Sequence, residues 1–511
     1  MGSNSSWFSH ILGPPNSMAR QTHIAPTMKV PVTVRMAPPE FDRLRDLVFR
    51  RHPDLEWASF ARFGWRATPS ELILTLAEIE MPEVGDLDES VGHVMINEPY
   101  TLRVALNAEA HPLAVGIIHS HPEGCIPRPS PIDDDMDGYY GPYFRDFAPG
   151  RPYVSLIFSK IDGEFAISGR VLWNDKWLHV ARFAIERTPT LAWIGGKRPP
   201  KDESTRERTA RLSAAFGDEA AARLRRSIVA VIGAGGTGSA AIEVLARAGV
   251  GKIIIVDPDH IDESNLERIH GSRPEDARRS ETKSELARAH VMSIDPNCEV
   301  EAYIGAVPQR EIVDAVVTAD LTLGCTDQQH SRLALSDLAT RYLVPCLDCG
   351  VALEGKEGKI TAQVLQIIRF LAVDPCALCR DLVIPNRLAQ ELMSPEERSR
   401  RRAAALEARE RGADGNAYWR ESPQLNTVGY LTTMVGAMVA GYAVGWLTGR
   451  FDAPFRRLQL NLTGKLLDVV EPEETARQEC SCRRVRGWAD QAAADALITA
   501  PSHWSPVRSL Q

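Results

Sequence analysis

Residues 228–238, Ile-Val-Ala-Val-Ile-Gly-Ala-Gly-Gly-Thr-Gly, decide the fold of the larger half of the chain. The apolar residues predict a buried strand, the glycines a tight loop, and residues 239–248 a helix. A second apolar run at 252–256 ends at Asp257. This pattern predicts a right-handed βαβ unit of a doubly wound sheet, with a loop that cradles nucleotide phosphates. The loop glycines are Gly233, Gly235, Gly236 and Gly238.

Length and composition limit the class of protein. A chain of 511 residues with 44% hydrophobic content has material for more than one core, because domains rarely exceed about 250–300 residues. A net charge of −8 gives no footprint for nucleic acid or an anionic membrane. Nine cysteines are too sparse for a secreted disulfide framework. We therefore expect a cytoplasmic enzyme that acts on proteins or metabolites.

Changes of pattern along the chain predict its domains. Residues 1–27 have no apolar core of a signal peptide and are expected to be a disordered tail. Residues 28–190 alternate short strands and helices and predict a mixed α/β domain, followed by a linker at 191–207. Residues 208–485 predict a doubly wound, Rossmann-like domain, and 486–511 a C-terminal tail. The apolar run 431–447 is interrupted by glycines and is expected to be a buried helix.

Individual elements are predicted from apolar periodicity and turn residues. The first domain has a predicted helix at 41–51 and strands at 57–65, 71–80, 93–96, 114–118, 154–159 and 163–173. The second domain continues with strands at 299–304, 321–324 and 343–347, an antiparallel section at 359–368 and a charged helical stretch at 391–411.

The first domain contains the ligand pattern of an open zinc site. His119 and His121 are separated by one residue, so both side chains lie on one side of an extended segment. Asp133 would arrive from the following helix, and water would take the fourth position. Ser130 would donate a hydrogen bond to a tetrahedral oxyanion, and Glu56 is the favoured base for the water proton. Alternative bases are Glu71, Glu78 and Glu80.

These residues together resemble the signature of the JAMM/MPN metalloprotease family. The resemblance covers residues 28–190 and includes an upstream Glu56, then His119-Ser-His121, then Ser130-Pro-Ile-Asp133. It implies cleavage of peptide or isopeptide bonds after the C-terminal glycine of ubiquitin-like proteins, with His119, His121 and Asp133 as zinc ligands. A His-Ser-His sequence in an ordinary surface loop is the alternative.

The second domain carries further motifs besides its glycine loop, which alone is also found in dehydrogenases. These motifs are Asp257-Pro-Asp259, Ser264-Asn265-Leu-Glu-Arg268, Lys283 at a helix start, Cys325-Thr-Asp327 and Gly350. Together they resemble the ThiF/MoeB-like family, which includes ubiquitin-activating enzymes, over about residues 208–483. A dehydrogenase that binds NAD does not explain them.

The ThiF/MoeB resemblance implies a site for ATP and Mg²⁺. Asp257 would bind the ribose, with Asp259 beside it, and the glycine loop would pack on phosphate. Phosphate charge would be neutralised by Asn265, Arg268 and Lys283, and Asp327 would hold magnesium. Arg211 matches an arginine that family members supply across a dimer interface, so a homodimer is expected. Taken singly, Asn265 and Arg268 could form a polar turn, and Lys283 could be a solvated helix residue.

Two close cysteine pairs fall where many relatives of that family bind structural zinc. The pairs are Cys376 with Cys379 and Cys480 with Cys482, and the second is Cys-x-Cys rather than Cys-x-x-Cys. Four thiolates would close a tetrahedral site, whereas buried free thiols are the alternative. No cysteine occurs between Arg380 and Glu479, where thioester-forming relatives usually place one. The chain is therefore expected to stop at the acyl-adenylate.

The sequence as a whole predicts a bifunctional enzyme of a ubiquitin-like protein system. A zinc peptidase would expose or regenerate a C-terminal glycine, and the second domain would adenylate that carboxylate with ATP and Mg²⁺. The expected partners are a ubiquitin-like protein and a conjugating-enzyme-like protein. One alternative is the processing and activation of a sulfur-carrier protein in cofactor or amino-acid biosynthesis, and another is a non-catalytic scaffold.

Overall fold

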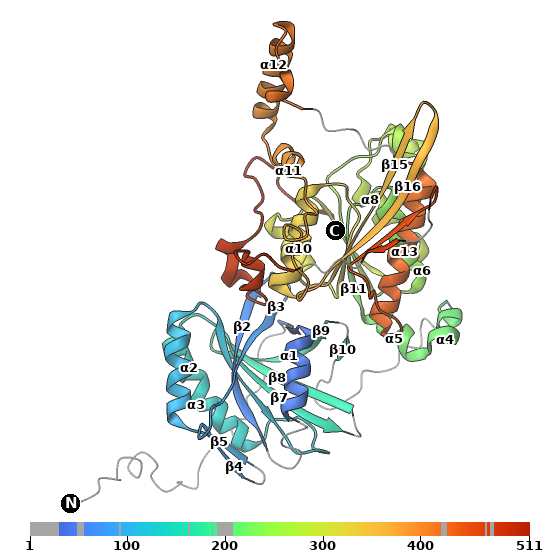
Figure 1. Ribbon diagram of the computed structural model, residues 1–511. Coiled ribbons are helices and arrows are strands. Elements are labelled where there is room, and N and C mark those ends of the chain that lie inside the picture. Colours follow the sequence, from blue (N-terminus) through green and yellow to red (C-terminus); the bar gives the residue numbers. More distant parts are fainter. Residues whose placement is uncertain are drawn as a thin grey trace, which may run out of the picture.

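The computed structural model shows two packed α/β halves, and Figure 1 displays the N-terminal half below the C-terminal half. It describes residues 30–48, 56–90, 93–161, 164–186, 188–191, 208–420, 427–464, 468–470 and 475–510. The tail predicted at 1–27 and all of the predicted linker except Leu191 therefore lie outside the described residues.

The N-terminal half is built on one curved sheet. Strand β1 pairs with β3 at one end of the sheet and with β9 near the other end, so seven strands close into a ring. The strand order is β1 (Val32–Met36), β3 (Leu72–Glu80), β2 (Ala58–Ala67), β6 (Ala114–Ser120), β7 (Tyr153–Ile161), β8 (Glu164–Trp173), β9 (Lys176–Ile185) and β10 (Thr188–Leu191). A separate hairpin pairs β4 (Leu87–Ser90) with β5 (His93–Ile96).

Helices cover this sheet on both faces (Figure 1). On one face, α2 (Glu98–Ala110) and α3 (Pro131–Phe147) pack around Phe60, Tyr100 and Phe144. On the other face, α1 (Pro38–Asp46) inserts Phe41 and Leu44 into the second core cluster of the domain. Every one of these five aromatic or leucine side chains is buried, so the helices hold the sheet in place.

The C-terminal half has the predicted doubly wound sheet. Parallel strands β11 to β15 form its centre, and β11 lies between β12 and β14, so the strand order reverses there. The strand order is β18 (Asp468–Val470), β17 (Arg457–Asn461), β16 (Lys359–Phe370), β15 (Cys346–Lys356), β14 (Leu321–Gly324), β11 (Ile228–Ile232), β12 (Lys252–Val256), β13 (Glu299–Ile304) and β19 (Arg508–Leu510).

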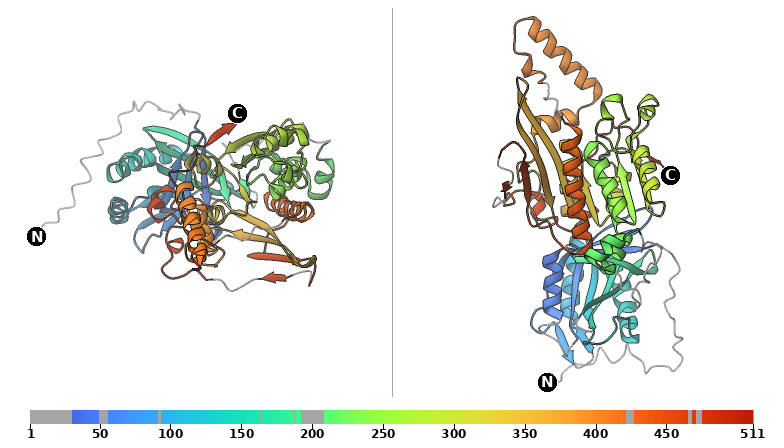
Figure 2. Two further views of the ribbon diagram at one scale, coloured as in Figure 1. Left: turned by 90° about the horizontal axis from the view of Figure 1, so that it is seen from above. Right: turned by 90° about the vertical axis from the view of Figure 1, so that its right-hand side faces the viewer.

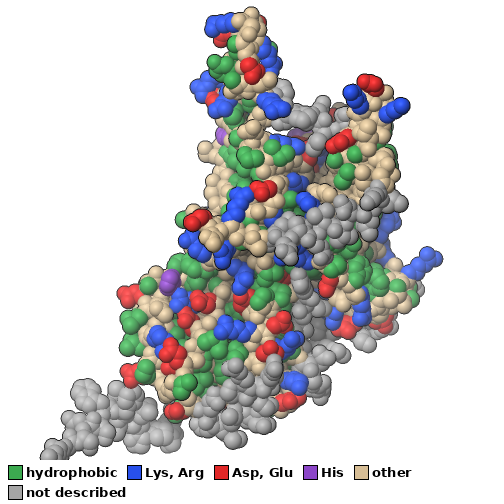
Figure 3. Space-filling view, in the orientation of Figure 1, with side chains coloured by type: hydrophobic (Ala, Val, Ile, Leu, Met, Phe, Trp, Pro, Cys, Tyr) green, Lys and Arg blue, Asp and Glu red, His purple; other side chains and the backbone are tan. Residues whose placement is uncertain are grey.

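The helices of this half pack on both faces of the sheet, except α12 (Pro395–Glu410), which extends away from it (Figures 1 and 2). They are α4 (Ala210–Phe216), α5 (Asp218–Arg226), α6 (Gly236–Ala248), α7 (Pro274–Arg278), α8 (Lys283–Ile294), α9 (Arg310–Val316), α10 (Gln329–Tyr342), α11 (Pro385–Glu391), α12 (Pro395–Glu410) and α13 (Gly429–Thr448). Figures 1 and 2 show α12 projecting away from the rest of the molecule. On the face drawn in Figure 3, acidic and basic side chains are interspersed over both halves.

The apolar helix α13 is the predicted buried helix. By length and composition it could cross a membrane, but 67% of its most apolar window is buried in the protein. It packs against α6 and the β15–β16 ribbon, as the two views in Figure 2 show. The close approach to α6 needs Gly436, because a Cβ there would clash with the Thr237 carbonyl oxygen. The helix therefore belongs to the core of the C-terminal half.

The C-terminal end differs from the predicted tail. Residues 508–510 form β19, which pairs antiparallel with β13, and residues 490–495 form a short 3₁₀ segment. Strands β1, β4, β9 and β10 were likewise not predicted, because they are short or irregular in their apolar alternation. The strand expected at 343–347 begins later, at Cys346, and continues as a long ribbon to Lys356.

Candidate active sites and metal centres

The three predicted zinc ligands of the N-terminal half lie together. His119 lies near the end of β6, His121 follows that strand, and Asp133 lies in the first turn of α3. His119 Nε2 is 2.9 Å from Asp133 Oδ1, and His121 Nε2 is 3.3 Å from Asp133 Oδ2. One ligand atom from each residue lies within 4.8 Å of the others. The side chains can therefore reach a single cation.

A capping box orients Asp133. Its backbone N–H donates to Ser130 Oγ over 3.2 Å, and its carboxylate Oδ2 accepts from the Ser130 N–H over 2.6 Å. Arg170 Nη2 also donates to the Asp133 carbonyl oxygen over 3.0 Å. These bonds fix the carboxylate in the first turn of the helix. Ser130 Oγ accepts in this arrangement, so its hydroxyl proton can still be donated elsewhere.

The base candidate Glu56 lies beside this cluster. Trp57 N–H donates to Ser120 Oγ and the Ser120 N–H donates to the Trp57 carbonyl, both over 2.9 Å. This pairing places Glu56, just before β2, opposite His121, just after β6. Burial opposes charge on His121, but Asp133 and then Glu56 outweigh it and raise the His121 pKa.

The other predicted base candidates are engaged elsewhere or lie farther along the sheet. Glu71 Oε2 accepts a hydrogen bond from Thr33 Oγ1 over 2.8 Å, and Glu80 forms an ion pair with Arg62. Glu78 is exposed on β3, which is separated from β6 by β2. The geometry therefore favours Glu56.

The donor set fits zinc. Two imidazole nitrogens and one carboxylate oxygen are the ligands of many open catalytic sites. His119 is 3% exposed, and neither of its ring nitrogens has a hydrogen-bond partner among the described residues. The Nε2 atom is near Asp133 but is not aligned for a hydrogen bond, and buried polar atoms without partners are rare. A metal ligated by this histidine accounts for that observation.

The glycine loop between β11 and α6 has the geometry of an anion site. Gly233 has a φ of +97°, and a side chain at Gly238 would overlap the Gly233 carbonyl oxygen. A Cβ at Gly235, in contrast, would meet nothing within 4 Å, so the loop opens to space there. The N-terminus of α6 has no side-chain cap, and its first N–H groups are available to a phosphate.

Asp257 fixes this loop from β12. Its Oδ2 accepts from the Ala234 N–H over 2.7 Å, and its Oδ1 accepts from the Asp259 N–H over 2.9 Å. The side chain is buried, and that burial raises the Asp257 pKa although Lys283 acts in the opposite direction. Asp259 is more exposed and accepts from Lys283 Nζ over 2.8 Å.

The predicted phosphate-binding residues lie around the same loop. Arg268 packs against Gly236 at the start of α6 and donates through Nη1 to the Ser264 carbonyl over 2.9 Å. Asn265 is buried, and its Nδ2 donates to Asp262 Oδ1 over 2.9 Å. Burial alone would lower the Lys283 pKa. The Asp257 and Asp259 carboxylates raise it by more than burial lowers it, so the net shift is upward. The lysine therefore stays charged at neutral pH.

Asp327 follows β14 at the point where the strand order reverses, which is where open α/β sheets bind ligands. Its side chain is 61% exposed and accepts from Arg387 Nη2 over 3.1 Å. Sequence reasoning missed Arg387, because it lies on α11, outside the motifs that predict the nucleotide site. It also missed Thr432 of α13, whose Oγ1 approaches Gly236 of the loop.

Arg211 lies away from these residues within one chain. It is exposed on α4, and Thr209 just before that helix packs against Gly249 at the C-terminal end of α6. The glycine loop is at the opposite end of α6, about 20 Å away. Arg211 could therefore act on a nucleotide only in another subunit, and the dimer remains an expectation.

The four cysteines form the second candidate metal centre. Cys376 Sγ is 3.6 Å from Cys480 Sγ, and Cys379 Sγ is 3.8 Å from Cys482 Sγ. Four sulfurs at about 2.3 Å from a zinc ion lie about 3.8 Å apart. The Arg477 N–H donates to Cys379 Sγ over 3.3 Å, as expected for a thiolate ligand. The Cys-x-Cys spacing of the second pair therefore still permits a tetrahedral site.

Several known proteins are similar to parts of this chain. "Adenylyltransferase and sulfurtransferase UBA4" of Candida albicans is 34% identical over 167 residues, which are 32% of this chain and 36% of the relative. "Adenylyltransferase and sulfurtransferase MOCS3" of Drosophila ananassae is 31% identical over 148 residues, 29% of this chain and 32% of the relative. The chain thus spans about a third of these relatives.

Among solved structures, E. coli MccB with AMPCPP and MccA matches with a TM-score of 0.40 and 14% identity, covering 55% of this chain and 76% of that one. The ThiF family model matches residues 207–484, which is more than half of the chain and begins after the N-terminal half. The ThiF part of the resemblance is therefore confirmed, while the zinc cluster of the N-terminal half rests on its own geometry. The chain belongs to the ThiF family.

Proposed function

We propose that the C-terminal half adenylates the C-terminal carboxylate of a ubiquitin-like protein with ATP and Mg²⁺. The observation that carries this proposal is the grouping of charged and polar residues at the C-terminal ends of β11 and β14. There an uncapped helix start, Arg268, Lys283 and the accessible carboxylate of Asp327 converge. A triphosphate carries several negative charges, and these residues supply cations and N–H groups for them.

In the proposed reaction, a carboxylate oxygen of the protein substrate attacks the α-phosphorus of ATP. The bond to the bridging oxygen breaks, and pyrophosphate leaves with the electron pair. Arg268 and Lys283 stabilise the charge that develops on the phosphates, Asn265 helps to position them, and Asp327 holds the magnesium ion. The Asp257 carboxylate, which was predicted from the sequence to bind the ribose, accepts from the Ala234 and Asp259 N–H groups and so holds the loop. We therefore propose Asp259, beside it, for the ribose hydroxyls.

The names of the relatives favour a sulfur carrier as the ubiquitin-like substrate. Both are named adenylyltransferase and sulfurtransferase. The alternative reading of the sequence, activation of a sulfur-carrier protein, is thus better supported than entry into a conjugation pathway. The lack of any cysteine between Arg380 and Glu479 agrees with an enzyme that stops at the adenylate.

Pyrophosphate exchange tests this proposal. The chain is incubated with ATP, labelled pyrophosphate and a ubiquitin-like protein that ends in Gly-Gly, or the same protein without its last glycine. Exchange should require the intact C-terminus and should fall by about 100-fold or more in Asp327→Asn. Asp218→Asn, which changes an exposed acid on α5, is the matched control. Exchange that is independent of any protein substrate, or equal in both variants, would refute the assignment.

We further propose that the N-terminal half is a zinc hydrolase that cleaves peptide or isopeptide bonds, as its JAMM/MPN resemblance implies. The cluster of His119, His121 and Asp133 beside Glu56 carries this second proposal. Zinc held by these three residues would supply Lewis acidity and acidify a water molecule. Glu56 would accept the proton of the attacking water and pass it to the leaving amine. The Ser130 hydroxyl would donate to the oxyanion.

The two reactions would share one substrate. Hydrolysis after a C-terminal glycine yields the carboxylate that adenylation consumes. Joining both sites in one chain raises the effective concentration of that product at the second site. A linear fusion of the ubiquitin-like protein to a reporter tests whether cleavage precedes adenylation, because only the cleaved protein has a free C-terminal glycine. Adenylation of the uncleaved fusion would show that the second activity does not depend on the first.

A further inference from the structure

A short segment near the C-terminus lies between the two halves of the molecule. We call residues 486–491 the interdomain segment. On one side, its Gly487 and Ala489 N–H groups donate to the carbonyl oxygens of Thr340 and Arg341 in α10, over 3.0 and 2.9 Å. The segment is therefore fixed to the C-terminal half through its backbone.

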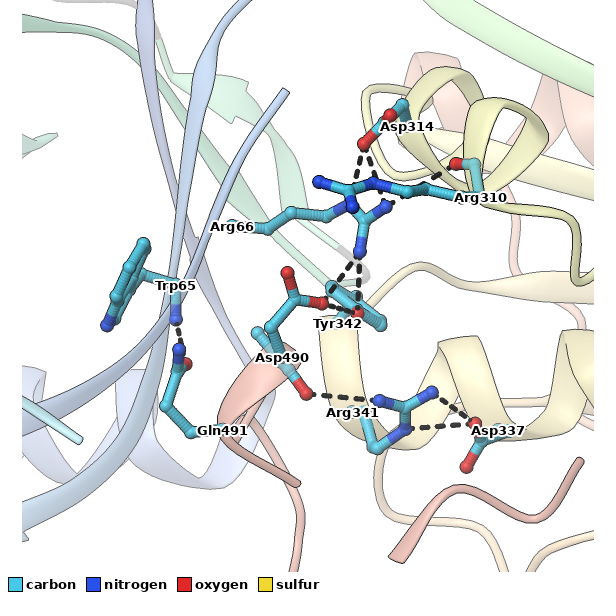
Figure 4. A network of polar contacts seen from close by, with 10 residues as sticks. Trp65, Arg66, Arg310, Asp314, Asp337, Arg341, Tyr342, Asp490 and Gln491 are labelled. Atoms are coloured by element: carbon cyan, nitrogen blue, oxygen red, sulfur yellow. Dashed lines mark hydrogen bonds and ion pairs between the residues drawn. The ribbon is translucent and has the colours of Figure 1, made fainter. Parts of the chain in front are cut away.

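On its other side, the interdomain segment contacts strands β2 and β3 of the N-terminal half. Thr75 Oγ1 donates to the Gly487 carbonyl over 2.7 Å, and Gln491 Oε1 accepts from the Trp65 N–H over 2.7 Å. Trp65 and Ala489 also form an isolated parallel bridge. The segment thus acts as an added piece of sheet edge, and Figure 4 shows Gln491 and Asp490 on the side of β2.

Charges reinforce this contact. Arg66 of β2 is 9% exposed in its side chain and donates to Asp490 Oδ1 over 2.7 Å and to Asp314 Oδ1 over 2.8 Å. Asp490 also accepts from the Tyr342 hydroxyl (Figure 4). Arg66 of the N-terminal half is therefore paired with acids from two elements of the C-terminal half. These two ion pairs fix the position of β2 relative to the C-terminal half.

The packing leaves no free space at this point. A Cβ at Gly64 would come closer than 3.0 Å to the Gly487 carbonyl oxygen. Ala489 is fully buried with a φ of +47°, a conformation that residues other than glycine rarely adopt. Such a conformation persists only where the surroundings determine it.

The four-cysteine centre immediately precedes the interdomain segment. Cys482 is four residues before Arg486, and its partners Cys376 and Cys379 follow β16. The Ala377 N–H donates to Ser336 Oγ of α10 over 2.8 Å. The cysteine cluster and the segment are thus attached to the same helix. A bound metal would tie residues 480–482 to that helix across 104 positions of sequence.

We propose that the metal held by the four cysteines fixes the interdomain segment and, through it, the docking of the two halves. Glu56 and Trp57, beside the zinc cluster, directly precede β2, and Trp65 and Arg66 near the other end of that strand contact the segment. Strand β2 therefore runs from the zinc cluster of the N-terminal half to the interdomain segment. The role is positional, because none of these cysteines contacts the reacting atoms.

Hydrogen exchange on the full chain tests the proposal. In Cys480→Ser/Cys482→Ser, the bound zinc should fall by one ion per chain. Exchange should then rise by about tenfold or more in residues 486–491 and 60–67, while α6 stays protected. A rise confined to residues 376–382 and 477–485 would overturn the proposal, because the metal would then stabilise only its own loops.

Two further variants keep the test decisive if the double variant unfolds globally. Cys480→His should retain the metal and leave exchange of β2 unchanged, whereas Cys480→Ser should not. Gly64→Ala should keep both metals and still raise exchange in residues 486–491, because it pushes against the Gly487 carbonyl. Gly441→Ala, where a Cβ meets open space, is its control. Equal exchange in Cys480→Ser and Cys480→His, or in the two alanine variants, would refute the proposal.

Discussion

The two candidate metal centres of this chain differ in ligand number, ligand chemistry and surroundings. The N-terminal cluster has two imidazoles and one carboxylate from within one strand and the next helix, and an additional acid, Glu56, stands beside it. The C-terminal cluster has four thiols from two segments separated by 104 positions. Three ligands leave a position for substrate or water, whereas four close the site. We therefore expect the three-ligand cluster to support chemistry and the four-thiol cluster to hold two distant segments of the chain together.

The largest expected effect concerns the ligands of the open centre. His121→Ala or Asp133→Asn should abolish cleavage of a ubiquitin-like fusion, because two remaining ligands do not hold zinc in an open site. Pyrophosphate exchange should continue in both variants, since the two halves have separate cores. Zinc content and cleavage are measured on the same preparations. Cleavage retained at normal rate after loss of that zinc would show that the cluster is not a catalytic centre.

The second prediction distinguishes the proposed proton acceptor, Glu56, from the residues that would hold the zinc. Glu56→Gln should keep the zinc but lower the cleavage rate by about 100-fold or more, because an amide cannot accept the proton of the attacking water. Glu78→Gln, an exposed acid on the neighbouring β3, is the matched control and should cleave normally. Steady-state cleavage rates and zinc content are measured for both variants. A slow Glu78→Gln enzyme beside a normal Glu56→Gln enzyme would assign the base to Glu78.

The third effect should appear in stability rather than in turnover. Cys379→Ser opens the closed centre, and the loss of its metal should lower the melting temperature by several degrees, because metal binding there contributes to folding. Calorimetry with and without added zinc measures the change. His121→Ala should shift the melting temperature much less. A larger shift for His121→Ala would invert the comparison between the two centres.

The smallest effect is expected at Ser130, which combines a structural and a catalytic task. Ser130→Ala removes the helix cap of α3 and should lower the free energy of unfolding by about 0.5–2 kcal/mol. It should also reduce cleavage, because the oxyanion loses a donor. Ser130→Asp keeps a cap without a hydroxyl donor, so it should recover stability but not rate. Full recovery of rate in Ser130→Asp would limit Ser130 to capping.

Both candidate sites could be predicted from the sequence, because each motif has short, fixed spacing. His119 lies on β6 and His121 directly follows that strand, and the Ser130–Asp133 box fixes its own geometry through local hydrogen bonds. The glycine loop and Asp257 belong to one βαβ unit, so their contact follows from the unit itself. The choice of Glu56 over Glu71 was less determined, because it depends on which strand neighbours β6.

The tertiary structure alone decided how the two halves meet. The sequence determined a βαβ nucleotide loop, a His-x-His cluster and two cysteine pairs, since local periodicity and spacing encode them. It gave no sign that residues 486–491 would lie between the halves, or that Arg387 would face Asp327. Such contacts join residues far apart along the chain, and they depend on the packed arrangement of whole elements rather than on any local pattern.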